Sequence, residues 1–367
     1  MENKKSRILI LNNKILALFI GLFVFIITSL IILINDLLNS PFKKIKKQKK
    51  DLFQGDSFPI ISAVIPNWNG KTFLKECLDS LLNQTFKDYE LILVDNGSND
   101  GSVEFIKNNY PMVKILAQPT NRGVAAGLNI GIRESKGKYI ALFNNDIVVD
   151  RHWMSKMYRI LEENNDVGFC ASKMLFYIQP DIINAAGDNF TNYGESINIG
   201  FKEKDCSQYN ISRYVFSACA GAAIYRRAML EEIGLFDEDF ITIYEDIDLG
   251  FRAQWRGWKC FYVSEAAVYH HGSATIGYSS PMHIFYLNRN NLNLIIKNLP
   301  LKLLLKYFYR FLIKQLKLSV QFGVNGSFIA FTKGKLCTLG QILCMLKKRN
   351  EILSNRKVDS IDRYWYV

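Results

Sequence analysis

Three carboxylates occur within four consecutive positions of the chain, at Glu245, Asp246 and Asp248. Carboxylates this close repel one another, so at least one pKa is expected to rise unless a cation or a reacting proton occupies the site. The same residue types are favoured in the first turn of a helix, where they interact with the helix dipole. The cluster alone therefore leaves open a reactive site and an acidic helix start.

Further polar residues follow predicted strands. Asp95 comes after an apolar run at 90–94, and Asp146 comes after another at 139–143. A carboxylate at a strand end, followed by a Gly/Ser/Asn turn, can accept from the imide N–H of a uracil or thymine ring. No G-x-G-x-x-G follows the first strand, which disfavours a dinucleotide-binding dehydrogenase.

The elements that would position these residues alternate between strands and helices. This alternation predicts an α/β fold with a parallel, doubly wound sheet and ligands at the carboxyl ends of its strands. The predicted strands are 60–66, 90–94, 113–117, 139–143, 167–171, 217–225 and 259–263, and the predicted helices are 74–82, 102–108, 124–134, 152–163 and the acidic cluster to about 256.

Two stretches of this pattern are unusual. Residues 179–214 are rich in Asn and Gly and are expected to form a variable loop or hairpin excursion. The strand expected at 217–225 has almost no side-chain bulk from Ala218 to Ala223. Either a ligand or a tightly packed neighbouring element would explain so bare a backbone.

Charge is distributed unevenly along the chain. The net charge is +12, but residues 58–280 carry −6 while the two flanks are basic. The basic charge therefore favours an anionic membrane surface as its partner, and no nucleic acid is expected. The seven cysteines are scattered without a C-x-x-C pair, which suits a reducing compartment.

The flanks are predicted to associate with a membrane. Residues 15–34 contain no charge and are long enough to cross a bilayer, and the run is too long for a cleaved signal peptide. Basic residues between 43 and 50 then favour a single-pass protein of the inner or cell membrane with its main domain in the cytoplasm. The expected organisation is an N-terminal tail at 1–14, a transmembrane helix at 15–34, a basic linker at 35–57, the main domain at 58–295 and an amphipathic, membrane-associated helical tail at 296–367.

The tail repeats a cation every four residues, at Lys302, Lys306, Arg310 and Lys314. One cationic face and a wide apolar arc are typical of a helix lying in the membrane interface, and a helix packed on the main domain is the alternative. The apolar run at 336–346 is too short to span a bilayer.

Five ordered motifs of the main domain resemble family 2 of the inverting glycosyltransferases, in the branch usually labelled rhamnosyltransferase-like. The motifs are Ala63–Gly70, Cys77–Thr85, the turn after Asp95, Asn121–Gly131 and Phe143–Asp146. The similarity continues through the acidic cluster to Tyr269–Ala274. It implies a GT-A fold that uses a nucleotide-diphosphate sugar and usually a divalent metal, Mg²⁺ or Mn²⁺.

The resemblance also implies roles for particular residues. Asp246 would be the base that takes the acceptor proton, with Glu245 binding the acceptor or tuning Asp246. Asp146 and His270 would hold the metal, although Asn144 stands where an Asp is often found, which leaves one carboxylate to work with diphosphate oxygens and water. The nucleotide would lie near Pro66, Asn67, Asp95, Asn96, Arg122, Gly123, Asn144 and Asn145, and Asp248, Trp255 and Trp258 would support the site or the acceptor.

The expected function is transfer of a sugar such as rhamnose from a UDP or dTDP donor to a lipid-linked glycan in cell-surface polysaccharide synthesis. Processive synthases of this family carry Q-x-x-R-W. Gln254–Trp258 has no Arg in the fourth place of this motif, so addition of one or a few sugars is expected. A sugar nucleotidyltransferase would need a Gly-rich triphosphate loop, which residues 67–72 do not form. A catalytically silent nucleotide-sugar-binding protein is made conceivable by Asn144, although Asp246 and His270 argue against it.

Overall fold

The computed structural model describes residues 2–39, 59–272, 277, 280–324, 327–362 and 365. Most of the predicted basic linker and residues 273–274 of the last family-like motif lie outside these residues. The chain divides into two compact units. The sheet unit comprises Lys47–Asn189 and Ser196–Thr275, and the helical unit comprises Met1–Lys46, Phe190–Glu195 and Ile276–Val367.

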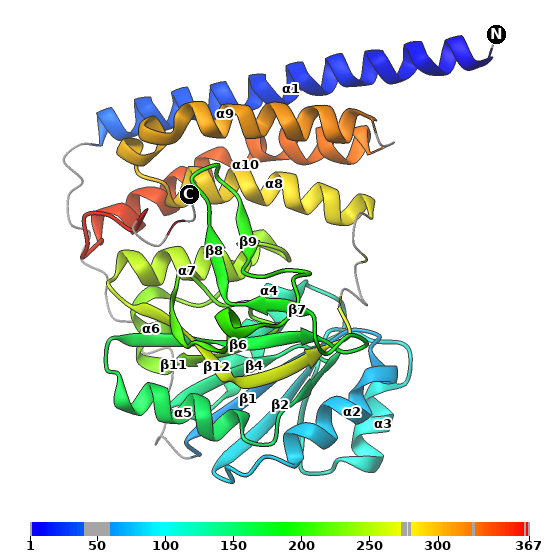
Figure 1. Ribbon diagram of the computed structural model, residues 1–367, viewed down its shortest axis with the longest axis vertical. Coiled ribbons are helices and arrows are strands. Elements are labelled where there is room, and N and C mark those ends of the chain that lie inside the picture. The colour runs from blue at the N-terminus through cyan, green and yellow to red at the C-terminus, as the bar shows by residue number, and fades with distance from the viewer. Residues whose placement is uncertain are drawn as a thin grey trace. The chain divides into compact units, whose positions relative to one another are not determined.

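The sheet unit is built on a ten-stranded sheet whose main path runs β10-β12-β6-β11-β4-β1-β2-β3 (Figure 1). Its strands are β1 (Ile61–Asn67), β2 (Tyr89–Asp95), β3 (Lys114–Ala117), β4 (Tyr139–Phe143), β5 (Ile147–Val149), β6 (Val167–Phe176), β7 (Ile183–Ala186), β10 (Arg213–Val215), β11 (Ala222–Arg226) and β12 (Lys259–His270). A separate pair joins β8 (Asp188–Phe190) to β9 (Ser196–Asn198). The helices are α2 (Lys71–Leu82), α3 (Ser102–Asn109), α4 (Val124–Glu134), α5 (Trp153–Glu163), α6 (Arg227–Ile233) and α7 (Glu245–Trp255), with short 3₁₀ turns η1 (Ser207–Asn210) and η2 (Glu238–Phe240).

The sheet is mixed, and the prediction of a parallel sheet was wrong for β5, β7, β10 and β11, whereas β12 does pair with β6 in parallel. Strands β1, β2, β3 and β4 pair in parallel, but β11 runs antiparallel to both β4 and β6. The segment 177–221 leaves β6 and returns beside the end of β4, where the Asn144 N–H donates to the Gly221 carbonyl at 2.8 Å. Because no crossover carries the chain to the opposite edge, the next strand must run the other way.

Apolar side chains pack on both faces of the sheet. Successive residues of a strand point to opposite faces, and in β1 Ala63 packs in the layer that contains Leu78 of α2, while Val64 packs with Leu128 of α4. Helix α4 approaches β1 closely at Gly131, which has no side chain. A Cβ there would lie 2.2 Å from Val64 Cγ1. Strands buried on both sides therefore read as continuous apolar runs in the sequence.

The bare segment before β11 also serves close packing. Strand β11 begins at Ala222, so Ser217–Gly221, which was predicted to be the first part of a strand at 217–225, precedes β11 as a loop. A Cβ at Gly250 of α7 would lie 2.3 Å from Ser217 Oγ. The small residues here allow α7 to pack directly on the loop.

The helical unit contains α1 (Glu2–Leu38), α8 (Pro281–Asn298), α9 (Leu301–Val324) and α10 (Phe328–Ser354). Phe25 of α1 stacks on Phe308 of α9 with ring centroids 5.6 Å apart. Asp36 of α1 forms a buried ion pair with Arg349 of α10 at 2.5 Å. The N-terminal helix therefore packs against the tail helices α9 and α10.

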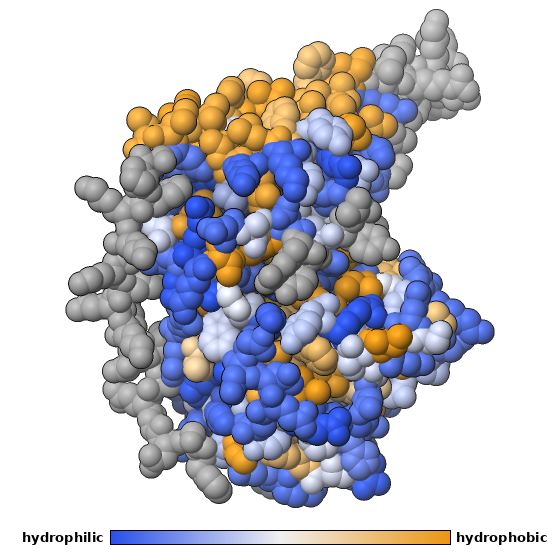
Figure 2. All heavy atoms as spheres, turned by 60° about the vertical axis from the view of Figure 1, so that its left-hand side comes forward, coloured by the Kyte–Doolittle hydropathy of each residue, from blue (hydrophilic) through white to orange (hydrophobic). Residues whose placement is uncertain are grey.

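Two helices of this unit are long and apolar enough to cross a membrane, namely α1 over Asn12–Leu38 and α10 over Phe328–Ser354. The apolar run at 336–346 was predicted to be too short to span a bilayer. It forms only the middle of α10, which extends beyond it at both ends. Apolar side chains gather in a band on the helical unit (Figure 2). The exposed apolar residues of α1 include Phe19, Phe23, Ile26, Leu30, Ile34, Leu37 and Leu38.

The cationic face predicted for the tail is partly neutralised within the helical unit. Lys314 pairs with Glu195 at 2.5 Å, and Lys306 pairs with Asp362 at 2.7 Å. The Arg310 guanidinium lies over the ring of Tyr193 at 5.5 Å. The face that the sequence presented as purely basic therefore also binds other parts of its own unit.

Candidate active site

Three polar side chains meet at the carboxyl ends of the central strands. Asn67 Nδ2 donates to Asp95 Oδ1 at 2.9 Å, and Asn145 Nδ2 donates to Asn67 Oδ1 at 2.7 Å. The Ser98 N–H donates to the other oxygen of Asp95 at 3.0 Å. Asp95 is buried and keeps free lone pairs, because each carboxylate oxygen can accept two hydrogen bonds. The structure thus brings together Asn67, Asp95 and Asn145, while Pro66 lies one residue earlier in β1.

The glycine after Arg122 is required by its surroundings. Gly123 has φ +90°, and a Cβ there would lie 2.6 Å from Ile241 Cγ2. Asn96 Nδ2 donates to the Gly123 carbonyl at 3.1 Å, and the buried Asn96 Oδ1 has no partner. The Arg122 side chain is 57% exposed and lies 3.4 Å from Glu238 Oε2. Its partner in the structure is Glu238, which sequence reasoning missed.

Asp146 and His270 form a buried pair. Asp146 Oδ1 lies 3.3 Å from His270 Nε2, which makes no hydrogen bond with any residue that the structure describes. His270 Nδ1 lies 3.1 Å from the Oδ1 of Asn184, a buried residue of β7. Because that oxygen can only accept, Nδ1 carries a proton, and in the neutral ring Nε2 then keeps a lone pair beside the carboxylate. An unpartnered imidazole nitrogen and a carboxylate oxygen at this separation fit a divalent metal.

The residues next to this pair point elsewhere. His271 faces away from Asp146, with its Nε2 3.4 Å from Glu76 and its ring stacked on Tyr177 at 3.9 Å. Asn144 lies beside Gly221, where an added Cβ would lie 3.0 Å from Asn144 Nδ2. Of the two adjacent histidines, only His270 is therefore placed to contribute to the Asp146 site.

A strained turn sets the start of α7. Ile241, Ile243 and Tyr244 have φ of 65°, 66° and 74°, a region that non-glycine residues seldom adopt. Asp246, partly exposed, accepts from the Ile247 N–H at 2.8 Å through Oδ1 and from the Ala220 N–H at 3.3 Å through Oδ2. Hydrogen bonds of this kind favour the charged carboxylate, although burial raises the pKa of Asp246.

The two other carboxylates of the cluster differ from Asp246. Glu245 is buried, and its Oε2 has no hydrogen-bond partner among the described residues. Burial together with the charge of Asp246 raises the pKa of Glu245 to about 8. Asp248 is fully buried and accepts from Arg252 Nε, one helical turn further along α7, at 2.9 Å. Arg252 also donates to the carbonyl of Leu235 at 2.8 Å, so Asp248 fixes α7 to the segment before it.

The two tryptophans after the cluster lie in or against the core. Trp255 is completely buried. Trp258 is half-buried, and its Nε1 donates to Glu232 Oε2 at 2.8 Å. These contacts favour a role in packing over contact with the acceptor.

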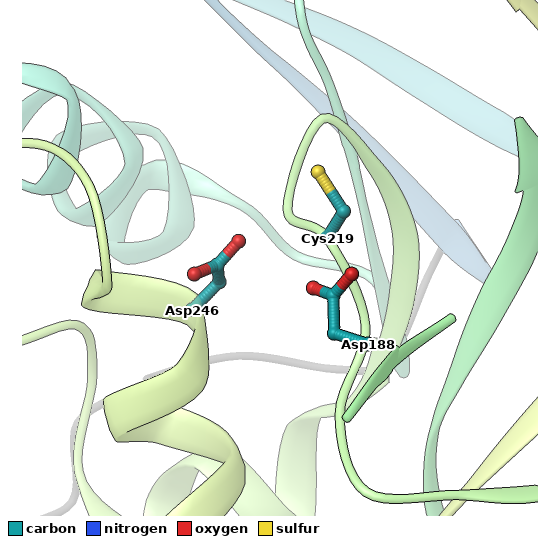
Figure 3. A group of neighbouring side chains, drawn as sticks. All are labelled: Asp188, Cys219 and Asp246. Carbon is teal, nitrogen blue, oxygen red and sulfur yellow. The ribbon is translucent and has the colours of Figure 1, made fainter. Parts of the chain in front are cut away.

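Asp188 is the residue beside Asp246 that the sequence did not reveal. Asp188, Cys219 and Asp246 each place one oxygen or sulfur atom within 4.8 Å of the other two (Figure 3). Backbone hydrogen bonds of 2.9 and 3.0 Å join Asp188 to Ser217, and Asn198 Nδ2 donates to Asp188 Oδ1 at 2.7 Å. Burial, and next the charge of Asp246, raise the pKa of the Asp188 carboxyl. Its position comes from a long-range bridge, which leaves no pattern in the sequence.

Comparison with known proteins agrees with this geometry. Residues 62–234 match the family model described as glycosyl transferase family 2. Glycosyltransferase GlyG of Streptococcus pneumoniae is 36% identical over 110 residues, 29% of this chain and 36% of the relative. A protein of Rickettsia prowazekii named an uncharacterized glycosyltransferase is 30% identical over 205 residues, 53% of this chain and 58% of the relative. The chain thus spans between about a third and three fifths of these curated relatives.

A solved structure shares the fold. The crystal structure of GalNAc-T7 with UDP, GalNAc and Mn²⁺ has a TM-score of 0.54 and 16% sequence identity, and the match covers 66% of this chain and 48% of that chain. The sheet unit therefore has a GT-A-like α/β fold with a mixed sheet.

Proposed function

We propose that this chain, which carries a family 2 glycosyltransferase domain at residues 62–234, is an inverting glycosyltransferase with a UDP- or dTDP-sugar donor. One observation carries the proposal. The loop before β11 connects the two carboxylate sites, because the Ala220 N–H donates to Asp246 while the next carbonyl, that of Gly221, accepts from Asn144, two residues before Asp146. A candidate base and a candidate metal site are therefore held by adjacent residues of one loop.

The donor side of the site would be formed by the strand ends. Asp95 would accept the imide N–H of a pyrimidine, and Asn67 and Asn145 hold that carboxylate in place. Asp146 Oδ1 and His270 Nε2 would hold Mg²⁺ or Mn²⁺, and the bound ion would offset the negative charge of the leaving diphosphate. Asn184 orients the imidazole for this role through its contact with Nδ1.

Asp246 would act as the base. Its carboxylate takes the proton of the acceptor hydroxyl while that oxygen bonds to the anomeric carbon. The bond from the anomeric carbon to the diphosphate oxygen breaks, and its electron pair leaves with the diphosphate. Glu245, which is neutral below a pH of about 8, would donate a hydrogen bond to the acceptor or to Asp246.

The acceptor is proposed to be a lipid-linked saccharide. The exposed apolar residues of α1 and the length of α1 and α10 support contact of the helical unit with a bilayer. We propose a location in the inner or cell membrane, with the sheet unit in the cytoplasm and the product used for cell-surface polysaccharide. Rhamnose as the transferred sugar rests on the motif resemblance.

The test is a donor panel. The full chain in native membranes would be incubated with UDP- or dTDP-sugars, Mn²⁺ and lipid-linked acceptor, and the extracted lipids would be analysed by mass spectrometry. We expect one donor to extend the acceptor with wild-type protein and not with Asp246→Asn, while both proteins bind the free nucleotide. Equal extension by the two proteins would refute the assignment of the base. In a separate incubation with sugar phosphate and nucleoside triphosphate, formation of a sugar nucleotide would favour a nucleotidyltransferase.

A further inference from the structure

The pair formed by Asp188 and Asp246 has no countercharge in the part of the chain that the structure describes. Asp188 is 2% exposed, and neither carboxylate forms an ion pair with a described side chain. The titratable groups that interact with Asp188 include Asp246, Cys219, Tyr225 and Cys260, and these four are neutral or negative. A buried carboxylate and a partly exposed one this close cannot both ionise without a large electrostatic cost.

The hydrogen bonds decide which of the two keeps a proton. Asp246 lies in the first turn of α7, is partly exposed, and accepts two backbone N–H groups. Asp188 is more deeply buried and accepts one amide, from Asn198, through Oδ1. The surroundings of Asp246 favour the charged form, and those of Asp188 favour the neutral form.

We propose that Asp188 is a positioning residue for Asp246, a buried carboxylic acid that keeps its proton at neutral pH so that the pair carries a single negative charge, located on Asp246. The proposal rests on the proposed role of Asp246 as the base. A neutral Asp188 leaves Asp246 free to be ionised and ready to accept a proton. It also keeps a second negative charge away from a site that would receive an anionic nucleotide-diphosphate sugar.

The first test measures stability against pH with Asp188→Asn in the full chain in detergent. Asn is neutral and close in shape to the protonated acid. A group whose folded pKa is raised stabilises fully below its unfolded pKa, 3.8 for Asp, and loses that contribution as pH rises through the folded value. The ratio of the unfolding equilibrium constants, wild type over Asp188→Asn, should therefore rise by up to about tenfold per pH unit above pH 5.

The matched control is Asp166→Asn, which removes a half-exposed carboxylate that pairs with Lys259 and should produce no such rise. A flat or opposite trend for Asp188→Asn would show that Asp188 is ionised in the folded protein and would overturn the proposal. So would a divalent cation that co-purifies with wild type and is lost in Asp188→Asn, because a cation between these side chains would replace the proton. Unfolding does not depend on transfer, so failure of Asp246 as the base would leave this result unchanged.

A second variant covers the case in which Asp188→Asn does not fold. Asn198→Leu removes the hydrogen bond that favours the charged form of Asp188. The loss of stability with rising pH should then continue to a higher pH than in wild type, because it ends at the folded pKa of Asp188, and an end at lower pH would contradict the proposal. Where transfer is measurable, kcat of the wild type should fall at the pH where Asp188 ionises. In Asn198→Leu this fall should occur at a higher pH, while KM for the donor should change little.

Discussion

Two buried carboxylate sites lie at the same edge of the sheet, and their neighbours make them different. Asp146 has an imidazole beside it whose free nitrogen points to the carboxylate at 3.3 Å. Asp246 has other acids beside it, Asp188 and Glu245, with raised pKa values. A carboxylate with a neutral nitrogen ligand is suited to a cation, while a carboxylate among acids is suited to handling a proton.

The partner side chains make the same distinction. Asn184 accepts from the imidazole of the first site, and Asn198 donates to Asp188 in the second. Each site thus has an asparagine that can be changed without altering any carboxylate. The comparison can be tested by changing one site and measuring the property of the other.

The largest effect is expected from Asp246→Asn. Loss of a general base should lower kcat by roughly 10²–10⁴-fold, because no carboxylate then accepts the proton of the acceptor hydroxyl. Nucleotide affinity, measured by calorimetry, should stay at the wild-type value, since Asp246 belongs to the proton-handling site. Asp166→Asn, at an exposed ion pair, is the control. Weaker nucleotide binding in Asp246→Asn alone would mean that the two sites are not separate.

Asn184→Ala should give the next largest effect. Without its partner at Nδ1, the His270 ring loses both its orientation and its preferred tautomer, and Mn²⁺ affinity in the presence of UDP should fall about 10–100-fold. Asn198→Ala is the matched control and should leave Mn²⁺ affinity unchanged. Titration followed by electron paramagnetic resonance measures both. Equal losses in the two variants would contradict the separation of the sites.

Sequence reasoning identified residues of both sites and missed one residue of each. Asp95, Asp146 and Asn67 could be placed because strand ends are marked by apolar runs, and Asp246 and His270 because they lie in recognisable motifs. Asp188 and Asn184 lie in the stretch expected to be a variable excursion. They reach the site through a bridge between Asp188 and Ser217 and through the pairing of β7 with β6.

The fold was predicted best where contacts are local. The helix at 124–134 and the strand at 139–143 occur with the predicted bounds. The antiparallel placement of β11 could not be read from periodicity, because a buried strand has the same pattern in either direction. The packing of α1 against α9 and α10 is similarly a long-range property that apolar content alone does not determine.

Glu245→Gln probes the second site through pH. The folded pKa of Glu245 is raised to about 8 from 4.5, so its stabilising contribution is complete below pH 4.5 and is lost as pH rises to about 8. Over that range, the unfolding equilibrium constant of the wild type should rise relative to Glu245→Gln by up to about tenfold per pH unit. Chemical denaturation at several pH values measures this. A constant difference between the two proteins would show that Glu245 is ionised in the fold.

The smallest effect is expected from Cys219→Ser. The thiol lies beside Asp188 and Asp246 but has no proposed part in the chemistry, so the change in the free energy of unfolding should be about 1 kcal/mol, typical of one substitution. Mn²⁺ affinity should be unchanged. A large loss of bound metal in Cys219→Ser would turn the second site into a cation site and remove the contrast.

The most direct measurement is Mn²⁺ binding in the presence of UDP, by the same full chain carrying either Asp146→Asn or Asp188→Asn. The contrast between a cation site and a proton site predicts that Asp146→Asn loses most of its Mn²⁺ affinity and that Asp188→Asn binds Mn²⁺ as wild type does. Retention of Mn²⁺ by Asp146→Asn together with its loss in Asp188→Asn would contradict the account.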